Sequence, residues 1–114
     1  MELPDPLREL LPLSPAVFYI LFALAEGEKH GYAIMKEAET VSGGQFTMGP
    51  GTLYTTIQRL LELGLIEETS TPSDTERRRR CYRLSRSGRQ LFDAELNRME
   101  SLVRAAQRRK LAAP

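Results

Sequence analysis

The sequence predicts a mainly α-helical domain that includes one small β-hairpin and ends in a long C-terminal helix. Two patterns predict this fold class. Apolar residues recur at helical spacing in five segments, and one strand–turn–strand pattern lies between residues 65 and 84. The chain has 114 residues, of which 41% are hydrophobic and 27% charged, so it can form one domain with one modest core.

Two helix starts are marked by a capping residue followed by proline. Asp5-Pro6 opens a short helix that ends before Pro12. Ser14-Pro15 opens the run AVFYILFALAEG, which is apolar on nearly all sides. We therefore expect this second helix to be central and buried.

A third helical segment follows His30 and ends at Gly43-Gly44. We expect His30 to cap or pack at the helix start rather than to act in chemistry. Residues 45–47 (QFT) are a candidate short strand. The segment has a partial apolar stripe, made up of Tyr32, Ile34, Met35 and Ala38.

A fourth helix is predicted from Pro50 to the stop signal at Gly64. Its core face follows from helical spacing and consists of Leu53, Ile57, Leu60 and Leu61. Its other face is polar and carries Thr52, Thr55, Thr56, Gln58, Arg59 and Glu62.

A hairpin follows, with strands at residues 65–69 and 80–84 around turn-forming residues 71–74. Because strand side chains alternate, Tyr82 and Leu84 share one face. Ser85 is the expected N-cap of the last helix. The return arm begins with four consecutive arginines, Arg77, Arg78, Arg79 and Arg80.

Helices followed by a polar hairpin form the winged helix-turn-helix arrangement, in which one helix enters the DNA major groove. Short polar side chains with Gln and Arg suit base edges, and Tyr54 suits a phosphate. The expected DNA-contacting residues of the helix are Thr52, Tyr54, Thr55, Thr56, Gln58 and Arg59. The alternatives are a plain amphipathic helix and a core tyrosine with a solvated hydroxyl.

The wing arginines Arg77–Arg80 are expected to contact phosphates or a narrow minor groove, because their mutual repulsion is relieved by an anion. The charge is polarised along the chain. Residues 1–69 carry 4 basic and 10 acidic side chains, and residues 70–114 carry 12 basic and 5 acidic, for a net charge of +1. The alternative is that the arginines only solvate a loop and a tail.

The last helix carries apolar residues at spacings of 4, 3, 4 and 3, the rhythm of a helix–helix seam. A small domain leaves such a seam uncovered, so we expect a twofold homodimer. The alternative is packing on the chain's own N-terminal helices. The expected dimerisation residues are Phe92, Leu96, Met99, Leu102, Val103 and Ala106.

No catalytic residues, metal ligands or cofactors are expected. His30 and Cys81 are the only His and Cys residues, too few for a structural zinc site. A redox role for Cys81 beside Arg80 stays open. No apolar run approaches the roughly 18 residues of a membrane helix, and the N-terminus lacks signal-peptide features, so we expect a cytoplasmic protein.

Three blocks resemble the PadR family of bacterial transcription regulators: residues 30–37 (HGYAIMKE), 49–67 (GPGTLYTTIQRLLELGLIE) and 77–92 (RRRRCYRLSRSGRQLF). The resemblance covers residues 14 to about 108. It implies a homodimeric winged helix-turn-helix repressor of the smaller subfamily, in which one long helix dimerises.

By position, the resemblance places Tyr32 in the block that opens the second helix of the motif. It places Thr52 and Tyr54 at the start of the DNA-contacting helix, and Tyr82 and Leu84 on the wing strand. Some members bind an aromatic or drug-like effector in a dimer-interface pocket often lined by tryptophan. This chain has no tryptophan, which leaves effector binding open.

The sequence thus predicts a winged helix DNA-binding domain with an N-terminal extension over residues 1–88. Residues 89–114 are predicted to be a C-terminal dimerisation helix within the same compact unit. The expected partners are double-stranded DNA, a second copy and an optional small-molecule effector, with no membrane. The expected function is repression from a near-palindromic operator; the alternative is a protein–protein interaction module without sequence-specific DNA binding.

Overall fold

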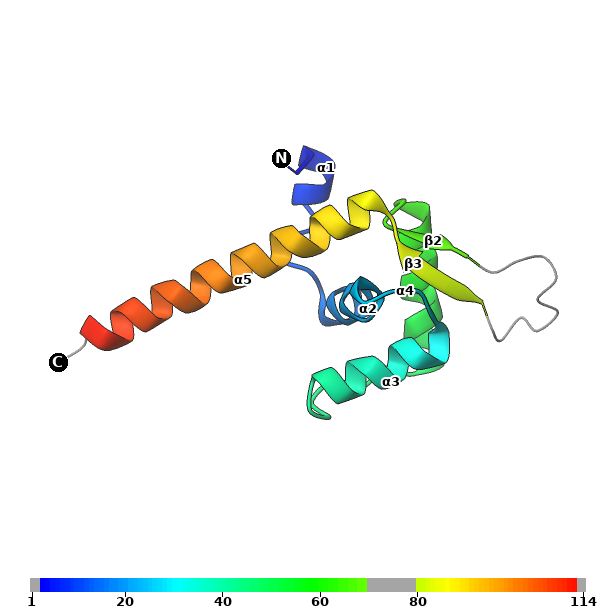
Figure 1. The fold of residues 1–114 in the computed structure, drawn as a ribbon, viewed down its shortest axis with the longest axis horizontal. Coiled ribbons are helices and arrows are strands. Elements are labelled where there is room, and N and C mark those ends of the chain that lie inside the picture. The colour runs from blue at the N-terminus through cyan, green and yellow to red at the C-terminus, as the bar shows by residue number, and fades with distance from the viewer. Residues whose placement is uncertain (1–2, 70–79, 113–114) are drawn as a thin grey trace.

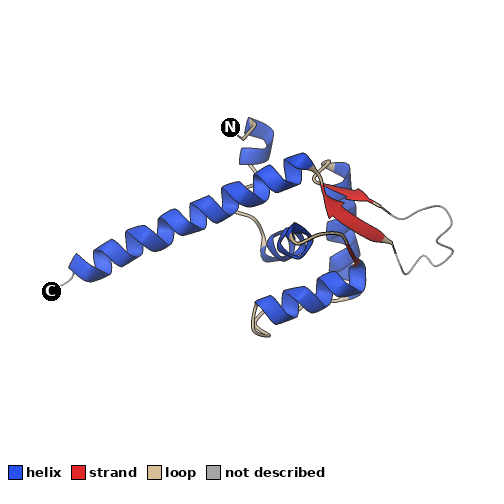
Figure 2. Ribbon diagram, in the orientation of Figure 1, coloured by secondary structure: helices blue, strands red, loops and turns tan. Residues whose placement is uncertain are grey.

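The computed structural model describes residues 3–69 and 80–112, the side chains of residues 111 and 112 excepted. Figures 1 and 2 show a group of helices with a small sheet at one side, and one long helix that projects from the rest. The elements in chain order are α1 (Asp5–Arg8), α2 (Pro15–Ala25), β1 (Lys29–His30), α3 (Gly31–Val41), α4 (Pro50–Glu62), β2 (Ile66–Glu68), β3 (Cys81–Leu84) and α5 (Arg86–Ala112).

Helix α2 is central, as predicted, and lies among α3, α4 and α5 in Figure 1. Its uniform apolarity lets it bury side chains toward all three neighbours. The buried core combines α2, α4 and α5 and includes Ile20, Leu21, Leu24, Leu53, Ile57, Leu60 and Leu91. The core therefore fixes the orientation of α4, whose polar side is left facing outward.

Side-chain caps set three of the helix starts. The Ser14 hydroxyl accepts the Val17 N–H at 3.3 Å, His30 Nδ1 accepts the Ala33 N–H at 3.3 Å, and Ser85 Oγ accepts the Gly88 N–H at 3.1 Å. These confirm the capping predictions for Ser14, His30 and Ser85.

The expected cap at Asp5 is wrong. Pro4 is the N-cap of α1 and makes no side-chain capping hydrogen bond, while Asp5 is the first helical residue. Its carboxylate instead stands 3.8 Å from an Arg8 nitrogen on the same exposed turn.

The sheet is antiparallel with the strand order β1-β3-β2. The predicted hairpin is confirmed with slightly shorter strands, and Ile66 pairs with Leu84. Strand β1 has only two residues, and its pairing with β3, Lys29 opposite Tyr82, comes from a segment far away in sequence. The helices and this hairpin form the predicted winged helix-turn-helix.

The strand expected at residues 45–47 is wrong, because that segment has no regular structure. Ser42 Oγ accepts the Phe46 N–H at 3.0 Å and ties the segment back to the end of α3. The Phe46 ring stacks on Tyr19 at 5.0 Å between ring centroids. An apolar contact with α2, rather than strand pairing, explains the aromatic residue here.

Helix α5 is anchored at its start and projects at its end. The Ser85 hydroxyl donates to the Gly64 carbonyl at 2.6 Å, and Leu91 and Phe92 are buried two turns further on. The helix has 27 residues and is continuous from Arg86, so the domain boundary drawn after residue 88 falls inside its first turn. Its C-terminal half extends away from the core in Figure 1.

Candidate nucleic-acid interface

The polar face of α4 is open to solvent. Thr52, Tyr54, Thr55, Gln58 and Arg59 are exposed, whereas Leu53, Ile57 and Leu60 on the opposite face are at most 2% exposed. The helix is therefore held by its apolar side and presents its threonine side outward. Thr56 is only half-buried, between the two faces.

Two polar side chains on this face bond within the helix. The Thr56 hydroxyl donates to the Thr52 carbonyl at 2.7 Å, and Gln58 Nε2 donates to Glu62 Oε1 at 3.2 Å. Thr56 is thus directed at its own backbone and is the weakest of the predicted contact residues. Within the described part of the chain, the Arg59 guanidinium has no hydrogen-bond or ion-pair partner.

The structure brings four of the predicted residues together around one shallow surface groove. Tyr54, Thr55, Gln58 and Arg59 line it together with Glu62. The groove combines a phenol, a hydroxyl, an amide and a guanidinium. These groups can donate to phosphate oxygens and to the acceptor atoms of base edges.

The Tyr54 side chain lies against Gly31, the residue that begins α3. A Cβ atom on Gly31 would lie 2.6 Å from the Tyr54 hydroxyl oxygen, so any side chain there would displace the phenol from this position. Tyr54 is 45% exposed and remains accessible. The motif's two helices therefore contact each other at this tyrosine.

Tyr82 has a structural role on the wing strand. It is 2% exposed, and burial, together with the charges of Glu68 and Tyr54, raises its pKa against the opposing effect of Arg80. The buried phenol stays neutral and is part of the hydrophobic core at the base of the wing. Leu84 is half-buried and packs against the same core, which confirms the prediction that Tyr82 and Leu84 share one face of the strand.

The described wing arginines are paired with acids on the neighbouring strand. Arg80 Nε lies 3.4 Å from Glu68 Oε1, and Arg83 Nε lies 3.8 Å from Glu67 Oε1. All four side chains are more than a third exposed, so these pairs are weak and a phosphate can displace the carboxylate. The other three predicted arginines, Arg77, Arg78 and Arg79, lie outside the described residues.

An exposed aromatic residue lies at the start of α3, and it was not predicted from the sequence. Helical spacing puts Tyr32 in the apolar stripe, but in the structure Tyr32 is 57% exposed. Lys36 Nζ lies 5.5 Å from the centroid of the Tyr32 ring, and the His30 ring stacks on Tyr32 with the two ring centroids 6.5 Å apart. The spacing of Tyr32 and Lys36, four residues apart on one helix face, is the sequence signal for this pair.

The prediction that Phe92 belongs to the dimerisation surface is wrong. It is 5% exposed and packs against Phe18 and Phe22 of α2, with ring centroids 5.8 and 5.9 Å away. Its own chain therefore covers it, because the first two turns of α5 lie on α2. The surface open to another molecule begins further along the helix, with Leu96, Met99, Leu102, Val103 and Ala106; Met99 is half-buried and the other four are exposed.

A buried carboxylate joins α5 to the N-terminal segment. Glu95 is fully buried and accepts hydrogen bonds from the Leu13 N–H at 2.7 Å and from the Arg98 guanidinium. Burial alone would raise the pKa of Glu95, but these two hydrogen bonds and the Arg98 charge outweigh it and lower the pKa. The ionised carboxylate holds the segment before α2 against α5.

Other kinds of site are not found in the described residues. No three His, Cys, Asp or Glu side chains there are grouped to hold a metal ion. No helix of that part of the chain is long and apolar enough to cross a membrane. Cys81 is half-buried on β3 and has interactions of its own.

These features define a winged helix DNA-binding domain built onto a long C-terminal helix. The model of the "Transcriptional regulator PadR-like family" matches residues 20–94, which include α3, α4, the hairpin and the start of α5. The chain therefore belongs to the PadR-like family of transcriptional regulators, whose members are regulators and not enzymes.

Known proteins similar to this chain include two relatives by sequence. An uncharacterized 37.1 kDa protein in transposon TN4556 of Streptomyces fradiae is 38% identical over 87 residues, a match that covers 76% of this chain and 24% of that protein. Transcriptional regulator Rv3488 of Mycobacterium tuberculosis is 34% identical over 86 residues, covering 75% of this chain and 77% of that protein. The chain thus spans about a quarter of the first relative's length.

A solved structure adds a comparison in three dimensions. The crystal structure of Bacillus subtilis PadR in complex with operator DNA superposes with a TM-score of 0.64 at 26% identity. The match covers 75% of this chain and 47% of that chain.

Proposed function

We propose that this chain is a cytoplasmic repressor that binds a near-palindromic operator as a homodimer. The observation that carries the proposal is the solvent-exposed polar face of α4, fixed by a buried apolar face. The likeness to Bacillus subtilis PadR, which was crystallised with operator DNA, supports the choice of DNA as the partner.

Within this proposal, α4 enters the major groove. Gln58 offers the amide pattern that pairs with adenine, and Arg59 offers the fork that pairs with guanine. Thr55 contacts a thymine methyl or a phosphate, and Thr52 lies in the first turn beside the backbone. The Tyr54 hydroxyl and the N–H groups at the start of α4 bind a phosphate, since Gly49 supplies no capping side chain.

Two flanking features extend the contact along the DNA backbone. Arg80 and the arginines before it bind phosphates on the wing side. Tyr32 and Lys36 bind phosphates beside the start of α3, next to Tyr54, through an accessible hydroxyl and an ammonium group. Such contacts give affinity that depends on salt and tolerates changes in DNA sequence.

Dimerisation uses the exposed apolar part of α5. Leu96, Leu102 and Val103 are 39%, 57% and 54% exposed, which is costly for a helix that stands alone in water. Pairing with the same surface of a second copy buries them and places two α4 helices on half-sites about one DNA turn, roughly 34 Å, apart. A repressor of this kind can be released by a small-molecule effector, for which a site is argued below.

The proposal is tested by measuring DNA affinity across a salt series with fluorescently labelled operator and random DNA. Replacing Gln58 or Arg59 by Ala should cost about 1–3 kcal/mol on the operator and little on random DNA. Replacing Arg77–Arg80 by Ala should weaken both and flatten the salt slope. Arg8→Ala, an exposed arginine on α1, is the matched control and should change neither.

The alternative function is a protein–protein interaction module that uses the arginines to bind acidic side chains. The same titrations separate the two functions. A dimeric protein that binds neither DNA at low salt contradicts repression by DNA binding and favours the module. Equal losses on operator and random DNA for Gln58→Ala and Arg59→Ala would assign these residues to phosphates.

A further inference from the structure

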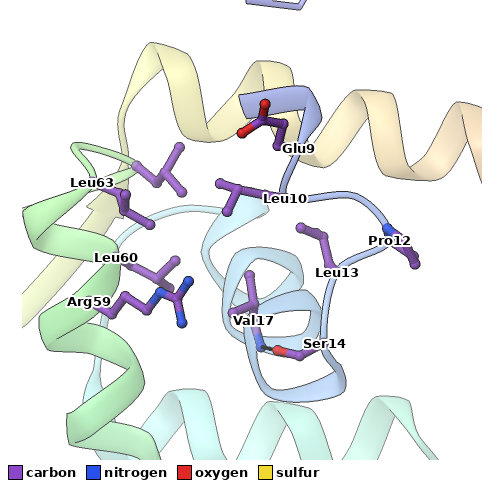
Figure 3. Close-up of a pocket in the computed structure, with 10 residues that line it drawn as sticks. Glu9, Leu10, Pro12, Leu13, Ser14, Val17, Arg59, Leu60 and Leu63 are labelled. Atoms are coloured by element: carbon purple, nitrogen blue, oxygen red, sulfur yellow. Dashed lines mark hydrogen bonds between the residues drawn. The ribbon is translucent and has the colours of Figure 1, made fainter. Parts of the chain in front are cut away.

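A cavity of about 280 Å³ lies between the N-terminal segment, the start of α2 and the C-terminal half of α4 (Figure 3). Seven of its ten lining residues are apolar, and Glu9, Ser14 and Arg59 contribute polar groups. The apolar residues include Leu10 and Leu13 from the N-terminal segment, Val17 from α2, and Leu60 and Leu63 from α4.

Arg59 lines both this cavity and the groove on the DNA-contacting face of α4. In Figure 3 its side chain extends from α4 toward Val17, while Glu9 lies at the opposite end of the cavity. Among the described residues the guanidinium has no ion-pair partner. A single cation therefore stands between two concave surfaces and can serve an anion on either of them.

The wall opposite α4 is held in place from α5. Leu13 lines the cavity, and its backbone N–H donates to the buried Glu95 carboxylate at 2.7 Å. Ser14, the next residue, caps α2. The cavity is therefore bounded by two anchored elements, which reduces the entropy that a ligand must remove when it binds.

The lining specifies the chemistry of an occupant. A guanidinium is planar and pairs with a carboxylate through two parallel hydrogen bonds. The leucine and valine side chains favour an apolar body, and Glu9, at the opposite end of the cavity from Arg59, disfavours a second negative charge there. We propose that the cavity binds a small amphipathic carboxylate, with its carboxylate on Arg59 and its alkyl body against Leu10, Leu13 and Leu60.

Binding there opposes DNA binding through one side chain. An Arg59 guanidinium paired with the ligand is withdrawn from the base edge, so ligand and operator compete for it. By linkage, DNA lowers the affinity for the ligand by the same factor as the ligand lowers the affinity for DNA. The competition between ligand and operator rests on the proposed function, whereas the binding of the carboxylate to the DNA-free protein does not.

The test is calorimetric titration of octanoate into the DNA-free wild-type chain, with octan-1-ol as the uncharged probe. Octanoate should bind one site per chain, and the alcohol should bind at least tenfold more weakly. Arg59→Met should weaken octanoate binding by about tenfold or more. The affinities of this variant for octanoate and octan-1-ol should then be similar. Arg8→Met, which removes the same charge one residue from Glu9 but outside the cavity, should leave octanoate binding unchanged.

A second variant fills the space instead of removing the charge. Val17→Phe should abolish octanoate binding while leaving operator binding intact, with its thermal unfolding measured to establish that it is folded. Octanoate that fails to bind, that binds Arg59→Met as tightly as wild type, or that binds Val17→Phe unchanged overturns the proposed site.

Titrations with operator DNA present distinguish a failure of the proposed ligand site from a failure of the proposed DNA-binding function. Octanoate that binds as described and raises the operator Kd of wild type, but not of Val17→Phe, supports both statements. Octanoate that binds while the operator Kd is unaffected overturns the competition and leaves DNA binding standing. Octanoate that binds a protein with no affinity for DNA overturns the proposed function and, with it, the competition.

Discussion

Replacing Gly88 by alanine tests how the first turn of α5 holds the winged domain together. A Cβ atom at this position would lie 2.0 Å from the Leu65 carbonyl oxygen and 3.0 Å from its carbonyl carbon. Both are backbone atoms, so no side-chain rotation relieves the overlap. The helix must move about 1 Å away from Leu65 before the first contact reaches even 3.0 Å.

Two opposing terms set the magnitude. In an exposed helix interior, alanine in place of glycine stabilises by about 1 kcal/mol. At Gly88, moving α5 outward loosens Leu91 and Phe92, which are 0% and 5% exposed, and overpacking of this kind costs about 1–3 kcal/mol, or more where the backbone is displaced. Because the overlap is with backbone atoms, the steric cost lies at the upper end of that range, about 2–3 kcal/mol, and the net loss should be about 1–2 kcal/mol.

Gly51→Ala is the matched control, because Gly51 is also helical and a Cβ there meets nothing within 4 Å. It should be neutral or stabilise by up to about 1 kcal/mol. The assay is urea unfolding followed by circular dichroism at one protein concentration for all variants, since association changes apparent stability. A Gly88→Ala variant as stable as wild type or Gly51→Ala would refute the close packing of α5 on Leu65.

Three further outcomes are expected. Met99→Glu places a charge within the apolar surface of α5 and should halve the sedimentation mass; an unchanged mass would refute the dimer surface. Glu95 has a lowered pKa in the folded state, so its contribution is complete near neutral pH and is lost as pH falls below the ordinary carboxyl value of 4.5. The unfolding free energy of Glu95→Gln should therefore be lower than that of wild type at pH 7, and the difference should narrow in acid; a difference that stays constant contradicts this. Lys36→Gln should reduce the slope of log Kd against log salt by about one on any DNA, and an unchanged slope would exclude a phosphate contact.

Most of the fold could be predicted from signals within short stretches of sequence. The capping residues Ser14 and Ser85 act on N–H groups three residues ahead, and the apolar spacing of α4 acts within one helix, so each can be seen in a short stretch of sequence. Strand β1 could not be predicted, because two residues become a strand only by pairing with β3, about fifty residues later.

The errors at the site also come from contacts between distant residues. Phe92 fits the seam rhythm of α5, but the rings of Phe18 and Phe22 cover it from α2. The spacing predicts an apolar stripe on α5, but it does not show whether α2 of the same chain or a second copy covers that stripe. Similarly, Arg59 and Leu13 line the same cavity, and the hydrogen bond from Leu13 to the buried Glu95 holds that wall in place. No pattern within α4 alone could predict this cavity.

The most direct measurement is selection of genomic DNA fragments by the purified protein, repeated with Gln58→Ala and Thr55→Ala. If the outer side of α4 reads bases in a twofold assembly, wild type enriches an inverted repeat with half-sites about one turn apart. Each variant then relaxes the preference at the same position in both halves. Fragments without a shared motif, or a motif that neither substitution alters, would contradict that assignment.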